Sequence, residues 1–273
     1  MISSLGGGKH ERMDAMASTS DRLPAPGPGY GRLLDKVAVI TGSSRGIGAA
    51  ISRAFAREGA TVIITYKEQE AQARLVAADC GSAMVCKMDV RSRDDVRACF
   101  TTARDRYGRI DILVNNAGVN RTADFDKLTE SDWDYVLDTD LKGVFLCCQE
   151  VLPVMSDKGR IINIGSLSGE YGGPRTPSYA AAKAGVMALT HCLARFVGPR
   201  GICVNCLSPG VIENEFTASS MSGCVRETVR SLLLLNRFGT YEDIVGAAVF
   251  LASGEAGYIT GQTLSINGGA WVR

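Results

Sequence analysis

The 273-residue sequence lacks several features that would place it in other classes of protein. Its formal net charge is only +1, so it lacks the strong basic excess of a nucleic-acid-binding protein. No apolar run reaches the roughly 18 residues that a membrane-spanning helix needs, and the first thirty residues contain no hydrophobic core of a secretory signal. We therefore expect a cytoplasmic protein with no nucleic-acid partner and no membrane partner.

Metal-binding and disulfide patterns are also missing. The chain has 2 histidines, and no group of His, Cys and Asp shows metal-ligand spacing, so we expect no metal. The 9 cysteines are scattered through expected helices and strands, which indicates reduced thiols rather than a disulfide scaffold. Cys203 and Cys206 form a C-x-x-C pattern, but residues three apart in a strand point to opposite faces, so we assign both to core packing.

Residues 1–32 differ in composition from the rest of the chain. They are rich in Gly, Ser, Pro and Met, and such a segment cannot bury a core. We expect a disordered or loosely attached arm over residues 1–32. The remaining residues, 33–273, have a length that suits one large α/β domain.

From residue 35 onward, short β-branched runs alternate with longer segments that have helical spacing of apolar residues. Most of the short runs are apolar throughout, which indicates strands buried on both faces. This alternation predicts an α/β fold with a single Rossmann-like, doubly wound domain, in which helices flank both faces of a seven-stranded parallel sheet. We expect strands at 37–40, 61–65, 83–88, 110–115, 160–164, 202–207 and 262–266, and helices that include 47–58, 94–107, 131–155 and 179–197.

A glycine-rich turn follows the first expected strand and leads into the first helix. Its glycines have the spacing G-x-x-x-G-x-G. Glycines let a backbone approach a pyrophosphate closely, and a helix N-terminus offers free N–H groups and a positive dipole. Ligands of doubly wound sheets lie beyond the carboxyl ends of the strands, so this turn predicts a dinucleotide site. Its candidate residues are Gly42, Ser44, Arg45, Gly46, Ile47 and Gly48.

The end of the second expected strand bears on which nicotinamide cofactor is used. An NAD site usually has an acidic residue there, which binds the ribose 2′-hydroxyl. Here the strand ends in Tyr66 and Lys67, and Arg45 lies in the glycine turn. Two cations suit the extra phosphate of NADP, although Glu68 and Glu70 follow closely and Lys67 also fits a solvated surface lysine. We expect NADP(H) ahead of NAD, with Tyr66 and Lys67 in the site.

Tyr179 and Lys183 lie four residues apart in an expected helix, and this spacing puts both side chains on one face. A free tyrosine has a pKa of about 10, too high for a base at neutral pH, and a nearby ammonium stabilises the phenolate form. Ser166 follows the strand expected at 160–164, and its hydroxyl can hydrogen-bond a substrate oxygen as charge develops. Y-x-x-x-K is also common on ordinary amphipathic helices. The pair therefore indicates a catalytic role only together with the motifs around it.

Several short motifs follow one another between residues 34 and 273. They are Thr41–Gly48 (TGSSRGIG), Asp89–Val90, Asn115–Gly118 (NNAG), Ser166, Tyr179-x-x-x-Lys183, Ser208–Gly210 (SPG) and Arg237–Gly239 (RFG). In this order they resemble the short-chain dehydrogenase/reductase family. The resemblance implies an NADP(H)-dependent oxidoreductase that reduces a ketone to a secondary alcohol, or catalyses the reverse. Tyr179 would be its acid/base, and Ser166 and Lys183 its other catalytic residues.

The resemblance also implies which residues line the cofactor site. Asp89 would bind the adenine amino group, and Val90 would pack against the adenine ring. Lys183, together with Tyr179, would contact the nicotinamide ribose. The remaining residues that the resemblance implies are Asn116, Ala117 and Gly118 near the adenosine ribose, and Pro209, Gly210, Ile212 and Asn214 near the nicotinamide.

One position departs from the family. Where the family usually has an asparagine, ahead of residues 142–145, this chain has Asp140. The asparagine is associated with a water that links the lysine to solvent. Aspartate has a similar shape but adds negative charge near Lys183, so we expect Asp140 to be the fourth catalytic residue of an enzyme with retained but retuned activity. This departure also leaves open a catalytically silent, dinucleotide-binding regulatory protein.

Within the family, residues 178–185 and 259–269 are most similar to β-ketoacyl-acyl-carrier-protein reductases. Such enzymes bind an acidic carrier protein with surface arginines, and the matching positions are Arg200 and Asp157, an acid where a base is needed. We therefore expect a small carbonyl or alcohol as the substrate. It is either a β-ketoacyl thioester, with an acyl-carrier protein as a doubtful partner, or another compound such as a sugar, steroid or secondary metabolite. The family is commonly tetrameric, so we expect a homo-oligomer, either a tetramer or a dimer.

Overall fold

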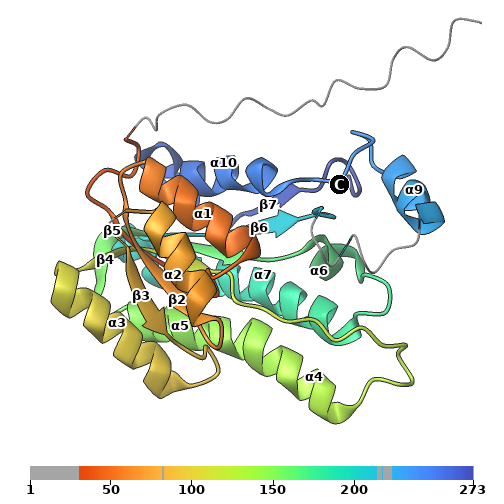
Figure 1. Ribbon diagram of the computed structural model, residues 1–273, viewed down its shortest axis with the longest axis horizontal. Helices are drawn as coiled ribbons and strands as arrows, with labels where there is room; N and C mark the ends of the chain where they lie inside the picture. The colour runs from red at the N-terminus through yellow and green to blue at the C-terminus, as the bar shows by residue number, and fades with distance from the viewer. Residues whose placement is uncertain (1–30, 82, 214–216, 218–222, 273) are drawn as a thin grey trace, which may run out of the picture.

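A parallel sheet forms the centre of the computed structural model, which describes residues 31–81, 83–213, 217 and 223–272 (Figure 1). The sheet has seven strands in the order β3-β2-β1-β4-β5-β6-β7, and all neighbouring strands pair in parallel. The strands are β1 (Val37–Ile40), β2 (Thr61–Tyr66), β3 (Met84–Lys87), β4 (Ile110–Asn115), β5 (Met155–Ile164), β6 (Cys203–Pro209) and β7 (Thr263–Ile266). The chain order reverses between β1 and β4, which is where a doubly wound sheet binds its ligand.

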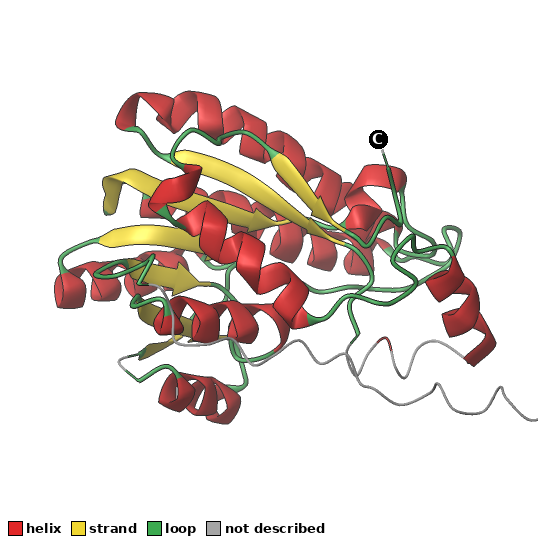
Figure 2. Cartoon of the chain, turned by 90° about the horizontal axis from the view of Figure 1, so that it is seen from above, coloured by secondary structure: helices red, strands yellow, loops and turns green. Residues whose placement is uncertain are grey.

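Helices cover both faces of this sheet, as Figure 2 shows from above. One face carries α1 (Gly46–Arg57), α2 (Glu70–Asp79) and α10 (Tyr241–Ala252), and the other carries α3 (Arg93–Tyr107), α5 (Gly143–Val151) and α7 (Pro177–Val197). Three further helices are α4 (Glu130–Leu137), α6 (Leu167–Tyr171) and α9 (Gly223–Ser231). Helix α4 leads through η1 into α5 and packs against α7, α6 also packs against α7, and α9 lies to one side of the sheet (Figure 1). The short helices are η1 (Asp138–Lys142), η2 (Gly198–Arg200) and η3 (Gly254–Ala256).

The predicted doubly wound α/β fold is confirmed, but the helix predicted over 131–155 contains a π-turn and ends at Val151. In place of a single helix over 131–155, the chain forms α4, then the π-helical turn η1, then α5, and Met155 already belongs to β5. A π-turn widens the helix locally, and such turns are frequent at functional sites. Here it leaves Thr139 and Asp140 buried. Apolar spacing continues across the turn, so the sequence pattern alone does not reveal it.

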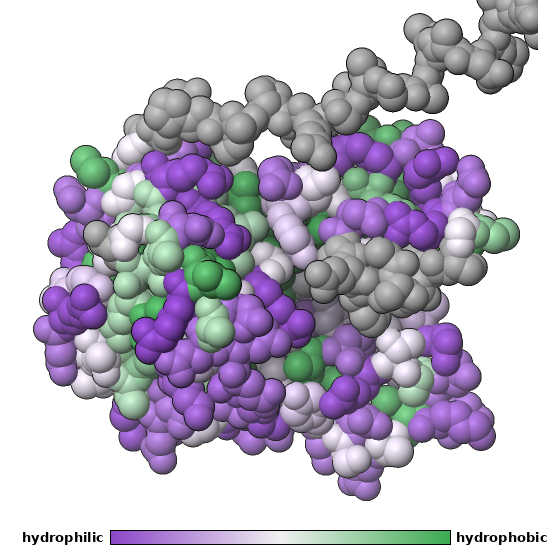
Figure 3. Space-filling view, in the orientation of Figure 1, coloured by the Kyte–Doolittle hydropathy of each residue, from purple (hydrophilic) through white to green (hydrophobic). Residues whose placement is uncertain are grey.

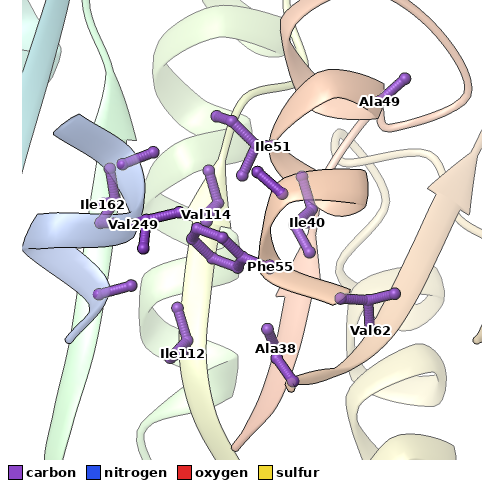
Figure 4. Close-up of a cluster of buried hydrophobic side chains, with 14 of the residues drawn as sticks. Ala38, Ile40, Ala49, Ile51, Phe55, Val62, Ile112, Val114, Ile162 and Val249 are labelled. Atoms are coloured by element: carbon purple, nitrogen blue, oxygen red, sulfur yellow. The ribbon is translucent and has the colours of Figure 1, made fainter. Parts of the chain in front are cut away.

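Two apolar clusters hold the three layers together, one on each face of the sheet. In the first, Phe55 of α1 is completely buried and lies beside Val114 of β4 and Ile40 of β1 (Figure 4). Outside, hydrophilic side chains cover most of the face in Figure 3, with hydrophobic ones in small groups between them. None of the helices in the described part of the chain combines the length and apolar character needed to cross a bilayer.

The described fold starts with a polar anchor ahead of β1. The backbone N–H and guanidinium of Arg32 donate to the Glu58 carboxylate at the end of α1, and Leu33 is fully buried. The arm proposed over residues 1–32 lies almost entirely outside the described residues. Its boundary with the domain at 33–273 therefore remains a prediction.

We predict that Phe55→Ala lowers the free energy of unfolding by about 3–5 kcal/mol, because truncation leaves a cavity that the rigid sheet cannot fill. Denaturant unfolding monitored by circular dichroism measures this change. The matched control is Leu75→Ala on α2, whose side chain is 67% exposed, and it should change stability by no more than about 0.5 kcal/mol. Similar losses for both variants would contradict the prediction.

Candidate active site

Four turns meet at one edge of the sheet, because the carboxyl ends of parallel strands lie together. They follow β1, β4, β5 and β6, and they carry the glycine turn, residues 116–118, Ser166 and Gly210 respectively. These turns therefore lie at the carboxyl edge of the sheet, whereas Asp140 comes from η1 and Tyr179 and Lys183 come from α7.

The glycine turn packs so closely against the end of β4 that side chains are excluded from two of its positions. Gly42 has φ +62°, and a Cβ there would lie 2.8 Å from Ala117 Cα. A Cβ on Gly48 would lie 2.5 Å from Asn116 Nδ2, the atom that donates to Thr41 O at 2.9 Å. Asn116 therefore ties the glycine turn to β4, and both glycines are needed for this contact.

The first turn of α1 is open to a ligand. Arg45, its N-cap residue, is extended and makes no side-chain capping hydrogen bond. A Cβ on Gly46 would meet only Tyr241 Oη, at 3.9 Å, and the flanking Ser44 and Ile47 are half-buried. Uncapped N–H groups with a positive helix dipole and free space in front fit a pyrophosphate group.

The predicted adenosine end contains an ion-pair cluster that the sequence did not reveal. Arg91 Nη2 lies 2.6 Å from Asp89 Oδ2, and this pairing holds the pKa of Asp89 below its ordinary value. Lys67 Nζ lies 3.7 Å from Asp89 Oδ2 and 3.3 Å from Glu68 Oε1, so it is neither isolated nor purely solvated. Arg91 therefore belongs to this ion-pair cluster, although no sequence motif marked it.

Two neighbours of this cluster are buried rather than open. Val90 packs against α5, where a Cβ on Gly143 would lie 2.8 Å from its Cγ2. Tyr66 is buried at the end of β2, and its pKa is raised by burial and by the nearby Glu70 carboxylate. Tyr66 therefore packs in the apolar cluster on one face of the sheet and Val90 in the cluster on the other face.

The predicted catalytic pair lies on one face of α7, as the spacing required. Helix α7 begins at Pro177, a residue suited to a first helical turn. Lys183 is 3% exposed, and its Nζ lies 5.4 Å from the ring centroid of Tyr179. Nζ also donates to Ile164 O at 3.0 Å, which fixes the ammonium at the end of β5. Tyr179 itself is half-buried, so its ring is partly open to solvent.

Ser166 lies two residues beyond Ile164 and is half-buried. Its Oγ caps α6 by accepting from Ser168 N at 3.1 Å. A hydroxyl that accepts in this way keeps its own proton for donation. Ser166 can therefore donate a hydrogen bond to a substrate oxygen while its orientation is set by the helix start.

Asp140 joins the same centre from the π-turn. It is completely buried, with Oδ2 3.2 Å from Lys183 Nζ and Oδ1 accepting from Val119 N at 2.7 Å. Burial raises the pKa of Asp140 against the opposing effect of Lys183. Burial alone would lower the pKa of Lys183, but Asp140 and Tyr179 outweigh it and the pKa is raised. The structure thus brings the sequence-predicted Asp140 into contact with Lys183.

A carboxylate clamp beside the predicted nicotinamide region was missed by the sequence reasoning. Glu170 Oε1 in α6 accepts from Ser208 Oγ at 2.5 Å and from Ser265 Oγ at 2.8 Å. It therefore ties the helix capped by Ser166 to the ends of β6 and β7. Only Ser208 had a sequence signal, through the SPG motif.

The other residues predicted near the nicotinamide continue from this clamp. Pro209 ends β6, and Gly210 N donates to Ile266 O at 2.9 Å. Ile212 is buried and forms an isolated bridge with Gly239. Asn214 lies outside the described residues.

The positions matched to carrier-protein binding are occupied by internal contacts. Arg200 Nε lies 2.8 Å from Asp157 Oδ1, and the guanidinium also donates to the carbonyls of Leu152 and Met155.

All 9 cysteines are free thiols, and no cluster with metal-ligand character occurs among the described residues.

Comparisons with known proteins agree with this geometry. A family model described as enoyl-(acyl carrier protein) reductase matches residues 42–270. The chain is 40% identical over 243 residues to the 3-oxoacyl-(acyl-carrier-protein) reductase FabG of Thermotoga maritima, covering 87% of this chain and 98% of that protein. It is 38% identical over 245 residues to the Staphylococcus aureus (strain Mu50) protein of the same name, covering 88% and 99% respectively.

A solved structure has the same architecture. The short-chain dehydrogenase/reductase from Serratia marcescens superimposes with a TM-score of 0.82 at 36% identity, covering 88% of this chain and 99% of that one. Sequence and fold therefore agree along nearly the whole of the described domain. The chain belongs to the short-chain dehydrogenase/reductase family of oxidoreductases, which bind a nicotinamide dinucleotide.

Proposed function

We propose that this chain is an NADP(H)-dependent reductase of ketones, with β-ketoacyl thioesters as its substrate class and Tyr179 as its acid/base. The observation that carries the proposal is the buried Lys183 ammonium, 5.4 Å from the Tyr179 ring and fixed at Ile164 O beside Ser166. The printed names of the FabG relatives, which describe 3-oxoacyl reduction, support the substrate class.

In the proposed reaction, two hydroxyls act on one carbonyl oxygen. Ser166 donates a hydrogen bond that orients this oxygen and stabilises the charge that develops on it. Tyr179 gives its hydroxyl proton to the same oxygen, and solvent later replaces that proton. When bound at this site, NADPH would supply the hydride to the carbonyl carbon. Oxidation of an alcohol uses the same groups in reverse.

The start of α1 and the end of β2 support NADP(H) as the cofactor. Gly42 and Gly48 let the turn approach the pyrophosphate, and the exposed Arg45 stands at the uncapped helix start. No acidic residue ends β2, where Tyr66 is followed by Lys67. Because Lys67 is already paired with Glu68 and Asp89, we assign the 2′-phosphate mainly to Arg45.

We propose that the substrate is attached to a small thiol such as coenzyme A rather than to an acidic carrier protein. Arg200 is paired with Asp157 and with backbone carbonyls, so its charge is already compensated. An acidic carrier would also meet the exposed carboxylate of Asp157. These contacts favour short thioesters or other small ketones as the substrate.

We also propose a cytoplasmic homo-oligomer, a tetramer or dimer, that assembles through α5 and α7. Phe145 on α5 is 42% exposed and Phe196 on α7 is 74% exposed, whereas Leu146 and Val186 are buried within the subunit. Exposed aromatic side chains on long helices suit a two-fold interface. Sedimentation of the purified protein measures the assembly.

We predict that Tyr179→Phe lowers kcat for ketone reduction at least about a thousandfold, because the carbonyl oxygen loses its proton donor. Stopped-flow measurement of NADPH oxidation with an acetoacetyl thioester gives the rate, and fluorescence titration checks that NADPH still binds. The control is Tyr258→Phe, which removes a hydroxyl from a fully exposed ring and should leave kcat unchanged. Full turnover by Tyr179→Phe would refute the proposed acid/base.

We predict that Arg45→Gln raises KM for NADPH at least about tenfold while KM for NADH stays the same, because only NADPH has the phosphate that the guanidinium binds. Initial rates with both cofactors provide the comparison. Lys36→Gln, which removes an exposed cation ahead of β1, is the control. Wild-type enzyme that uses NADH as well as NADPH would contradict the assignment.

We predict that the wild-type enzyme gains little from carrier-protein attachment, with kcat/KM for acetoacetyl-acyl-carrier protein within roughly threefold of that for acetoacetyl coenzyme A. Asp157→Arg should raise only the carrier-protein value, several-fold, whereas Asp105→Arg, with the same charge change on α3, should alter neither. Crotonyl coenzyme A in the same assay tests enoyl reduction. A strong wild-type preference for the carrier protein would be evidence against small thioesters.

A further inference from the structure

The Lys183 ammonium lies in a closed environment in which Asp140 is the principal counter-charge. The side chains of Lys183 and Asp140 are 4% and 0% exposed, and their charged atoms are 3.2 Å apart. Charges buried to this degree require a partner, because solvent no longer screens them. The two side chains therefore behave as one electrostatic unit.

Backbone geometry holds the carboxylate in this place. Asp140 Oδ1 accepts from Val119 N at 2.7 Å, and a Cβ on Gly118 would lie 2.7 Å from Oδ2. The π-turn η1 leaves Asp140 pointing inward, while Asp138 of the same turn is exposed and pairs with Lys142 at 3.1 Å. Of these two neighbouring carboxylates, Asp140 therefore faces the ammonium and Asp138 does not.

Three titratable groups face Lys183 from the elements packed around it: Asp140 from η1, Tyr179 from α7 and Cys206 from β6. Burial raises the pKa of the Cys206 thiol to about 11, so this group is neutral at pH 7. Asp140 has an ammonium and a backbone N–H as partners and carries the negative charge. It is therefore the group that compensates the positive charge of Lys183.

We propose that Asp140 is a positioning residue that compensates the charge of Lys183, so that Tyr179 keeps its proton at neutral pH and the site is biased toward reduction. A lone ammonium beside a phenol favours the phenolate, which is the form that accepts the alcohol proton while NADP⁺ takes the hydride. A carboxylate bound to that ammonium cancels part of this effect. Reduction needs the protonated hydroxyl, so the ion pair keeps more of the enzyme in the protonation state that reduces a ketone at neutral pH. This inference rests on the proposed function.

The test is Asp140→Asn, with pH profiles of kcat/KM measured for ketone reduction with NADPH and for alcohol oxidation with NADP⁺. Loss of the carboxylate should move the basic limb of reduction and the acidic limb of oxidation to lower pH by about one unit. Ultraviolet difference titration of the cofactor-free protein should show the tyrosinate signal at lower pH, with Tyr179→Phe used to identify that signal. Asp138→Asn removes an exposed carboxylate from the same turn and should leave both profiles unchanged.

Profiles and tyrosinate titrations that superimpose for wild type and a folded Asp140→Asn would overturn the inference while leaving the proposed function intact. Absence of ketone reduction by the wild type would instead refute the proposed function. If Asp140→Asn does not fold, Asp140→Ser offers a smaller neutral side chain, and the wild-type profile is decisive by itself. Reduction should be independent of pH through neutrality, and a decline that begins below about pH 7 would overturn the inference.

Discussion

The burial of one ammonium group is the constraint on which the rest of this site depends. An uncompensated charge at the depth of Lys183 would cost several kcal/mol, so its surroundings must supply negative potential. They do so with the Ile164 carbonyl at 3.0 Å and the Asp140 carboxylate at 3.2 Å. These partners belong to β5 and to η1, while Lys183 belongs to α7. The strand, the π-turn and the helix must therefore all be correctly placed for the Lys183 ammonium and the Asp140 carboxylate to lie beside Tyr179.

The same backbone segment connects this ion pair to the predicted cofactor site. Asn116 holds the glycine turn through the Thr41 carbonyl, and Val119, three residues later, donates its N–H to Asp140. Gly118 lies between them and can carry no side chain without meeting Asp140. A shift of this segment would alter the dinucleotide turn and the Lys183 environment at once. Residues 116–119 therefore connect the proposed cofactor turn to the proposed proton-transfer groups.

The likeness to the FabG relatives covers nearly all of the domain, and two groups of contacts in this chain lie at the positions matched to carrier-protein binding and beside the predicted nicotinamide region. The Asp157–Arg200 ion pair places an acid beside the arginine that resemblance would give to a carrier protein. The Glu170 carboxylate joins α6 to the ends of β6 and β7 through Ser208 and Ser265. These contacts lie outside the Lys183 centre, so they can differ within a common fold while that centre is kept.

Local sequence determined the elements and the type of chemistry, because strands, glycine turns and i, i+4 pairs have short-range patterns. It placed β1 and β4 at their observed bounds and Tyr179 and Lys183 on one helical face. Tertiary structure alone decided the π-turn, the burial of Asp140 against Lys183 and the pairing of Arg91 with Asp89 near Lys67. The spacing of apolar residues does not reveal the one additional residue that a π-turn adds to a helix. Ion pairs between distant elements depend on how the layers pack, and no local pattern encodes that distance.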